Sequence, residues 1–167
     1  MNGETKTIEQ ETIERAKAEF LRVKEMMIQA LAATPDDRIN WLPAPTARTP
    51  IQQVAHAAAA VKNVHEILNS RPFQITNTAE ADKSFREWEK QFTTRESVLQ
   101  MFEENCAEYS AWLDALTPEA LNATVELPFG SGFAPVSAAL SFAPNHTTWH
   151  TAQIHYMQTI YGDLDWH

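Results

Sequence analysis

Apolar residues recur every three or four positions over four long stretches of the chain. The first stretch runs over residues 8–33 and places its apolar positions in one stripe, with charged residues outside that stripe. This spacing is that of an amphipathic α-helix. The same period over residues 50–69, residues 94–116 and residues 136–161 predicts three more helices. The second of these four helices is apolar nearly all round, which is typical of a helix with neighbours packed closely about it.

Capping signals indicate where two of these helices begin. Thr49 suits the N-cap position, Pro50 suits the first helical position, and Gln52 can reach back to the backbone of the cap. Thr93 and Glu96 have the same spacing and predict a second capping box.

Proline and glycine indicate the other boundaries. Pro35 should end the first helix, because proline lacks an N–H group and restricts the residue before it. Gly162 suits the position just after the end of the last helix. Pro144 lies inside that last stretch. Either the helix kinks there, or a new helix begins with Pro144 in its first turn.

The segments between the helices are mixed in character. Residues 36–49 and residues 73–92 read as long loops, the second with room for a short helix. Thr117 and Pro118 start a short extra helical turn, and residues 125–135 are extended and rich in turns.

The predicted fold class is all-α, a four-helix bundle with a short extra helical turn and long loops. The chain has 167 residues, which is close to the length of one ordinary domain, and a chain of this size buries roughly 70% of its unfolded surface. We therefore expect a single domain over residues 1–167, in which residues 1–7 are flexible.

The charge of the chain narrows the choice of partners. Its formal net charge is −9, with 13 basic and 22 acidic residues. Nucleic acids and anionic membranes are bound through basic patches, so neither is an expected partner. Cys106 is the only cysteine, and no apolar leader or membrane-spanning run is present in the sequence. These features predict a protein of the reducing cytoplasm, without a disulfide framework.

Two histidines one helical turn apart carry the clearest chemical signal. His146 and His150 lie on one face of the last predicted helix, where two imidazoles can share a metal ion. A helical period places them in an apolar sector, so both should point inward. The glutamate of the His-Glu-x-x-His metalloprotease motif is missing. The predicted sector holds Ala139, Phe142, His146, His150, Gln153, Met157 and Ile160.

A third ligand is expected from another helix. His56 and His65 both lie on the second helix, but they are about half a turn out of phase and cannot both face one ion. Periodicity alone leaves this choice open. His155 should face away from the pair, and His167 is terminal.

Several segments of the chain resemble the DinB/YfiT-like metalloenzyme family, which is unrelated to the DNA polymerase that shares the first name. Residues 39–43 and 49–56 are similar to the segment that leads to the first ligand of that family. Residues 116–121 and 127–130 are similar to its third connection. Residues 145–154 are similar to its most specific motif, His-x-x-x-His-Arg-Gly-Gln. The resemblance covers nearly the whole chain.

The resemblance implies a four-helix bundle with a three-histidine metal site. By position it selects His56, His146 and His150 as ligands and leaves His65 as a packing residue. This chain departs from the family motif at two positions, where Thr151 and Ala152 replace arginine and glycine. Without the arginine, any contact that this side chain would make with an anion is in doubt, whereas the histidine ligands are retained.

Such a site would hold a divalent ion with a fourth position open to water or substrate. Zinc and nickel are the first candidates, and iron, manganese or cobalt are further ones, because imidazole suits all of them. Gln153 follows His150 by one turn, and Asn63 follows His56 by two turns. Both are candidates for contact with the ligands or with the substrate. No carboxylate stands out as a general base.

Three functions are compatible with the sequence. The resemblance implies a metal-dependent enzyme, and we favour a thiol-dependent S-transferase or isomerase that acts on a small electrophile with a low-molecular-weight thiol. A metal-dependent hydrolase is the first alternative. The second is a non-catalytic module of a stress response that binds a metal or a small molecule. A homodimer is compatible with each of these.

Overall fold

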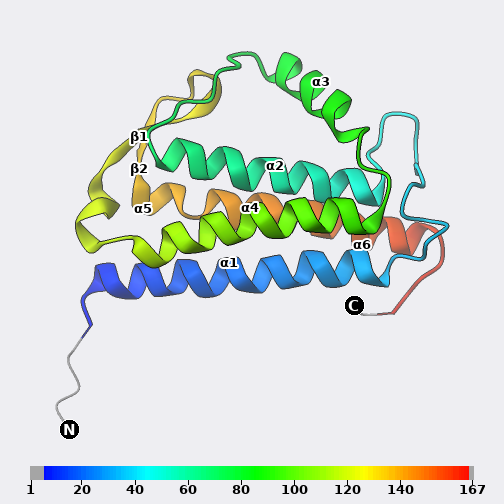
Figure 1. Ribbon diagram of the computed structural model, residues 1–167, viewed down its shortest axis with the longest axis horizontal. Coiled ribbons are helices and arrows are strands. Elements are labelled where there is room, and N and C mark those ends of the chain that lie inside the picture. Colours follow the sequence, from blue (N-terminus) through cyan, green and yellow to red (C-terminus); the bar gives the residue numbers. More distant parts are fainter. Residues whose placement is uncertain (1–5, 166–167) are drawn as a thin grey trace, which may run out of the picture.

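Four long helices form the body of the protein, as the apolar periodicity predicts (Figure 1). They are α1 (Ile8–Ala33), α2 (Pro50–Leu68), α4 (Arg95–Ala115) and α6 (Phe142–Ile160). The computed structural model describes residues 6–165. Most of the segment predicted to be flexible, residues 1–5, lies outside the described residues, and so does His167.

The four helices are arranged as a ring in which each packs against two neighbours. Helix α2 packs against α4 and α6, and α1 packs against the same two helices from the opposite side. Figure 1 shows that α1 and α6 run in one direction and that α2 and α4 run in the other. Two neighbours, α2 and α4, are therefore parallel, so the chain between them must travel back along the bundle.

Helix α2 begins as its capping signals predict. The Thr49 side chain accepts a hydrogen bond from the backbone N–H of Gln52 at 3.2 Å, and the Gln52 side chain accepts one from the N–H of Thr49 at 3.0 Å. At the start of α4 the cap is Thr94 rather than Thr93, and it accepts from the N–H of Ser97. The predicted capping box of Thr93 and Glu96 is therefore wrong by one residue.

Replacing Thr49 with alanine should destabilise the protein by about 0.5–2 kcal/mol, because the first turn of α2 would lose its cap. Equilibrium unfolding in urea measures this. Replacing Thr93 with alanine is the matched control and should change the free energy of unfolding by less than about 0.5 kcal/mol, since Thr93 is exposed and its side chain does not cap α4. Equal losses in the two variants would contradict the assignment of the caps.

The crossover from α2 to α4 contains a full helix, α3 (Thr78–Glu89). The sequence predicts only a short helix within a long loop here, so the structure extends that prediction. Asn77 caps the helix by accepting from the N–H groups of Ala79 and Glu80. Ala81 and Glu89 are its buried residues. Helix α3 packs against α2, and Figure 1 shows it across the outer side of α2.

A hairpin lies between α4 and the last helices. A 3₁₀ turn, η1 (Pro118–Asn122), leads into β1 (Thr124–Glu126), which pairs antiparallel with β2 (Phe133–Pro135). The turn between the strands contains a second 3₁₀ segment, η2 (Pro128–Gly130). The extended, turn-rich stretch of the sequence is thus a short β-hairpin.

Pro144 marks a new helix rather than a kink. The short helix α5 (Val136–Ala139) ends before α6 begins at Phe142, which places Pro144 in the first turn of α6. The helix ends at Ile160, and Gly162 follows with φ of 95°, the left-handed conformation that glycine adopts most readily.

Alanine and branched side chains of α2 lie at the centre of the core. Four of its five alanines are buried, which lets α4 and α6 approach closely. Beside them the ring of Phe20 on α1 meets the edge of the Tyr109 ring on α4, with centroids 4.6 Å apart. Between residues 6 and 165, no helix combines the length and the apolar character that a membrane span requires.

Candidate metal centre

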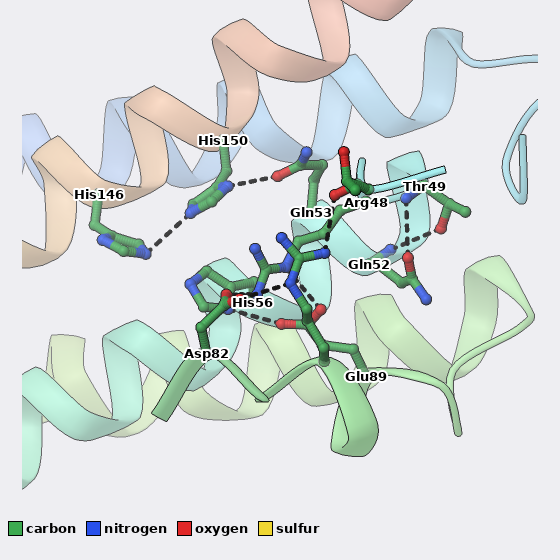
Figure 2. Close-up of polar contacts among 11 residues, drawn as sticks. Arg48, Thr49, Gln52, Gln53, His56, Asp82, Glu89, His146 and His150 are labelled. Atoms are coloured by element: carbon green, nitrogen blue, oxygen red, sulfur yellow. Dashed lines mark hydrogen bonds and ion pairs between the residues drawn. The ribbon is translucent and has the colours of Figure 1, made fainter. Parts of the chain in front are cut away.

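The structure brings together three histidines from two helices that pack side by side. His56 comes from α2, and His146 and His150 come from α6. One ring nitrogen of each histidine lies within 4.8 Å of those of the other two. The Nε2 atoms of His146 and His150 are 3.0 Å apart. Figure 2 shows the three rings turned toward one another between the helices.

A buried carboxylate orients His56. The Nδ1–H of His56 donates to Oε1 of Glu89 at 2.7 Å, and Glu89 is fully buried. Its other oxygen accepts from Nε of Arg48 at 2.7 Å, and Arg48 also donates to Asp82 at 2.9 Å. Because Nδ1 carries the proton, the lone pair of Nε2 is left to face the other two rings. Carboxylates orient metal-binding histidines in this way.

An amide orients His150. The Nδ1–H of His150 donates to Oε1 of Gln53 at 2.5 Å. Gln53 is buried on α2, three residues before His56. The lone pair of His150 Nε2 then points at Nε2 of His146 (Figure 2). Gln53 and Glu89 therefore set the same tautomer on two of the three rings.

The three nitrogens fit a divalent cation. Two nitrogens bound to one tetrahedral ion at ~2.0–2.1 Å lie about 3.4 Å apart, and the separations here bracket that value. Two imidazole lone pairs at 3.0 Å repel each other unless a proton or a cation lies between them. Three neutral imidazoles leave the charge of a divalent ion uncompensated, as in open zinc sites. The residues could thus hold a metal ion.

The surroundings keep two of the histidines neutral. Burial lowers the pKa of His146 to about 4, and the nearby charges of His56 and Arg48 act in the same direction. Burial lowers the pKa of His150 further, to about 3, with His146, His56 and Arg48 as additional causes. Metal binding requires neutral imidazole, so both rings are ready to bind at neutral pH.

The metal-free protein should lose stability as the pH falls below about 6.5. The pKa values of His146 and His150 are lower in the folded state than the ordinary value of 6.5, so acid protonates the unfolded chain first. The contribution of the two neutral rings to the free energy of unfolding is complete above pH 6.5. It declines as the pH falls toward 4 and 3, by up to about 1.4 kcal/mol per pH unit for each ring. Urea unfolding between pH 7 and pH 5 measures this decline.

Acidic side chains also titrate toward the low end of this range, so a control variant is needed. The double variant His146→Gln with His150→Gln removes both groups and should show a shallower loss of stability over the same interval. An unchanged slope in the double variant would contradict the assignment.

An apolar cavity opens beside the histidines. It has a volume of ≈ 220 Å³ and is lined by His56 and His146 at one end. Among residues 6–165, Asn63 is its only other lining residue with a polar side chain. The aromatic part of the wall consists of Phe73, Phe85, Phe129 and Phe142. The cluster therefore faces a space that a small molecule could occupy.

Asn63 and Gln153 lie on different sides of the cluster. Asn63 faces the apolar cavity. Gln153 is exposed and lines a separate groove with Gln53, Arg48 and Arg86. Hydrogen bonding by Gln153 to His150 opposes the lowering of the pKa of that ring. The two candidates are therefore near the histidines, and their contact with a ligand or substrate stays a prediction.

The predicted inward face of α6 is wrong in part. Phe142, Gln153 and Ile160 are exposed, so the buried face is rotated away from the predicted sector. His150 lies on the buried face, whereas His146 lies at its edge and is half-buried. The buried positions of α6 are Ala143, Pro144, Thr147, His150, Thr151, Ile154, Met157 and Gln158.

The other histidines lie outside the cluster. His65 is half-buried and its ring lies near those of Tyr109 and Trp112, at 6.1 Å from each. Burial lowers the pKa of His65. His155, which the sequence predicts to face away from His146 and His150, is also half-buried.

Two residues of the centre are missed by the sequence analysis. Glu89 is missed because α3 reads as a loop, although Asp82, Phe85 and Glu89 recur at helical spacing. Gln53 lies one turn before His56 on the same face of α2, and that spacing is the signal that could have identified it.

Comparison with known proteins identifies the family of the chain. The family model of the DinB superfamily matches residues 19–154. The chain belongs to the DinB superfamily. A search of curated proteins finds no match to this DinB-superfamily chain.

Solved structures share the fold of this DinB-superfamily protein. YfiT from Bacillus subtilis, described as "a probable metal-dependent hydrolase with an unusual four-helix bundle topology", has a TM-score of 0.72 and 18% identity. The match covers 97% of this chain and 93% of YfiT.

Two more distant sequences have nearly the same fold. An uncharacterized protein from Clostridium difficile 630 has a TM-score of 0.71 and 12% identity, over 89% of this chain and 96% of that one. A protein from Streptococcus pneumoniae has a TM-score of 0.68 and 15% identity, over 89% and 91%. At these identities the likeness concerns the four-helix bundle itself.

Proposed function

We propose that the protein is a metal-dependent enzyme, and that it transfers a low-molecular-weight thiol to a small electrophile. One observation carries the proposal: three imidazoles, two of them oriented by Glu89 and Gln53, converge beside an apolar cavity that His56 and His146 help to line. A structural metal site is usually closed by four protein ligands, whereas a catalytic site keeps a position open. Within residues 6–165 the group that could hold the ion consists of three histidines.

The proposed reaction balances without an external oxidant or reductant. The thiol sulfur forms a bond to the electrophilic carbon, the bond from that carbon to its leaving group breaks, and the leaving group keeps the electron pair. The proton of the thiol passes to solvent. If the thiol adds to a double bond and is later expelled, the same site catalyses an isomerisation. When bound, a divalent ion supplies Lewis acidity that favours the thiolate form of the thiol.

The protein residues supply orientation and exclude water. Glu89 and Gln53 hold two ligand rings in one tautomer. The phenylalanines of the cavity keep water away from the electrophile, which protects a reactive carbon from hydrolysis. Gln53, Gln153 and Arg48 line the groove on the other side of the histidines, where hydrogen-bonding groups could receive the polar part of a thiol.

Hydrolysis is the second candidate, and one observation favours it. YfiT, whose fold this chain shares, is described as a probable metal-dependent hydrolase. The cavity, as far as residues 6–165 line it, contains no carboxylate that could act as a general base toward water. This feature favours a nucleophile that ionises readily, and so favours the thiol over water.

One experiment distinguishes the functions. Protein purified without a histidine tag is loaded with zinc or nickel and incubated with a chlorinated nitroaromatic electrophile, with and without each of several low-molecular-weight thiols. Thiol-dependent product formation supports the transferase, and thiol-independent release of a carboxylate from ester substrates supports the hydrolase. Stoichiometric metal with neither activity supports the non-catalytic stress-response module. Protein that takes up no metal overturns the transferase, the hydrolase and a metal-binding role of the module.

A further inference from the structure

Four phenylalanines enclose the cavity beside the histidines. Phe73 and Phe85 stack with ring centroids 6.1 Å apart, and Phe129 meets Phe73 edge-on at 5.4 Å. Phe85 also meets the edge of the His56 ring at 5.2 Å. The fourth, Phe142, comes from the start of α6. The aromatic wall therefore extends from the hairpin to the edge of the metal centre.

The wall carries no charged side chain among the described residues. Asn63 can offer one amide to a ligand. The guanidinium of Arg48 is already bound by Glu89 and Asp82 and does not line this cavity. An anion inside the metal-free cavity would therefore have no ion-pair partner among the described residues of its walls. A cation could lie against the ring faces, but it would be repelled by Arg48 and by a divalent ion at the histidines.

Phe129 is held in this wall by an unusual backbone conformation. Its φ and ψ are 59° and 29°, in the left-handed region that bulky residues rarely occupy. The next residue, Gly130, also has a positive φ. Strain of this kind is found where a side chain must be aimed at a functional site. Glycine would adopt the same conformation without strain. The presence of phenylalanine here therefore indicates that its ring has a role at this position.

We infer that the substrate of the proposed reaction carries an uncharged aromatic or alicyclic ring, and that this ring binds in the phenylalanine cavity while the reactive carbon faces the histidines. The part of the inference that concerns the reactive carbon rests on the proposed function. The part that concerns the uncharged ring rests on the cavity alone. The volume of ≈ 220 Å³ accommodates one substituted ring, since an apolar cavity of about 150 Å³ accepts benzene. Asn63 is placed to contact a polar substituent on that ring.

Three probes of similar size and poor metal-binding ability test the inference: methyl phenyl sulfone, which is neutral, benzenesulfonate and phenyltrimethylammonium. Their dissociation constants are measured by NMR titration, with the protein both zinc-loaded and metal-free. The neutral probe should bind at least tenfold more tightly than either ion to the metal-free protein, and at least tenfold more tightly than phenyltrimethylammonium to the zinc-loaded protein. Tighter binding of either ion to the metal-free protein would overturn the inference. The binding results do not require catalysis, so a failed activity assay leaves this test intact.

Variants locate the binding. Phe129→Gly should weaken binding of methyl phenyl sulfone at least fivefold while the Tm stays unchanged, because glycine relieves the strain as the ring is lost. Phe133→Ala, an exposed phenylalanine on the same hairpin, is the matched control and should bind as the natural protein does. Asn63→Asp should shift the preference toward phenyltrimethylammonium by about tenfold. Unchanged binding in Phe129→Gly and Asn63→Asp would show that the probes bind elsewhere.

A second inference comes from the outer face of α6. Trp149, Tyr156 and Ile160 are 66%, 69% and 49% exposed, and no residue of the 19-residue helix is charged. Uncharged exposed helices are unexpected in a chain with a net charge of −9. Two copies that each carry a net negative charge repel each other least where the facing surfaces are uncharged.

We propose that two copies of the chain pair through this face. Together with Phe142, these side chains make four, and they expose roughly 400–500 Å², since large side chains present ~150–250 Å² each when fully exposed. A specific dimer buries ~800 Å² on each partner, so the four side chains supply about half of that area and the uncharged positions between them must supply the rest. Two copies of α6 related by a two-fold axis near residue 151 would run antiparallel and place Trp149 beside Ala152 of the second copy.

Sedimentation velocity over a range of protein concentrations tests the pairing. The natural chain should sediment as a dimer, and Tyr156→Lys should shift it to a monomer. Leu21→Lys replaces an exposed leucine of α1 and should leave the dimer unchanged. A natural chain that stays monomeric at all concentrations, or a dimer that Tyr156→Lys does not weaken, would overturn the proposal in favour of another occupant of this face.

Discussion

Replacing His150 with alanine is expected to abolish stoichiometric binding of a divalent metal ion. The ring of His150 lies close to both of the others, with its Nε2 3.0 Å from that of His146 and its centroid 4.8 Å from that of His56. Its loss leaves two ligands, and the effect on apparent affinity should exceed the 10–100-fold typical of an outer partner. Elemental analysis and competition with a chromophoric chelator measure the loss.

The matched control for this variant is His65→Ala. His65 is a half-buried histidine of the bundle, and its ring lies near Tyr109 and Trp112 rather than in the cluster. It should keep its metal in full. The prediction fails if His150→Ala retains one ion per chain, or if both variants lose the ion to the same extent.

Replacing Glu89 with glutamine should weaken metal binding and destabilise the fold together. The carboxylate accepts hydrogen bonds from His56 and Arg48 at 2.7 Å each while fully buried. An amide of the same shape carries no charge and presents one N–H₂ group to one of these donors. Metal affinity should fall about 10–100-fold. The free energy of unfolding should fall by about 2–5 kcal/mol, because Arg48 loses its ion pair with the buried Glu89 and keeps only the pair with the part-exposed Asp82.

Glu87→Gln is the control for the charge change on the same helix. Glu87 is exposed and pairs with Lys90 at the surface, so its loss should change the free energy of unfolding by less than about 0.5 kcal/mol. Urea unfolding and chelator competition are carried out on both variants. Metal affinity that is unchanged in Glu89→Gln would show that Glu89 has a structural role only.

The periodicity of the sequence predicts the four long helices because each of them buries a continuous stripe. In α1, residues such as Phe20, Val23 and Met27 are fully buried, and the stripe alone locates them. Helix α3 carries a shorter stripe, formed by Ala81, Phe85 and Trp88 among charged neighbours. Ala81 and Glu89 are its buried residues, and the ion pairs of Arg48 with Asp82 and Glu89 join it to the start of α2. A short stripe gives a weaker signal than the long stripes of the other helices, so the sequence predicts only a short helix there.

The site could be predicted only as far as it lies within one helix. His146 and His150 are one turn apart, so their spacing is visible in the sequence. The contacts from Gln53 to His150 and from Glu89 to His56 join different helices. They depend on how far each helix is rotated about its axis, and the exposed aromatic residues of α6 obscure that rotation because they resemble core residues. The resemblance to a known family selects His56, and no periodicity does.

The parallel course of α2 and α4 has a consequence for how this protein could diversify. Their connection must return along the bundle, and it is this returning segment that carries Glu89, Asp82 and Phe85 to the centre. It adds little to the buried core, whereas it supplies both the counter-charge of His56 and part of the cavity wall. Replacing the segment from residue 69 to residue 94 with another crossover should therefore change the metal affinity and the substrate preference. The three histidines would stay in place, because they lie on α2 and α6.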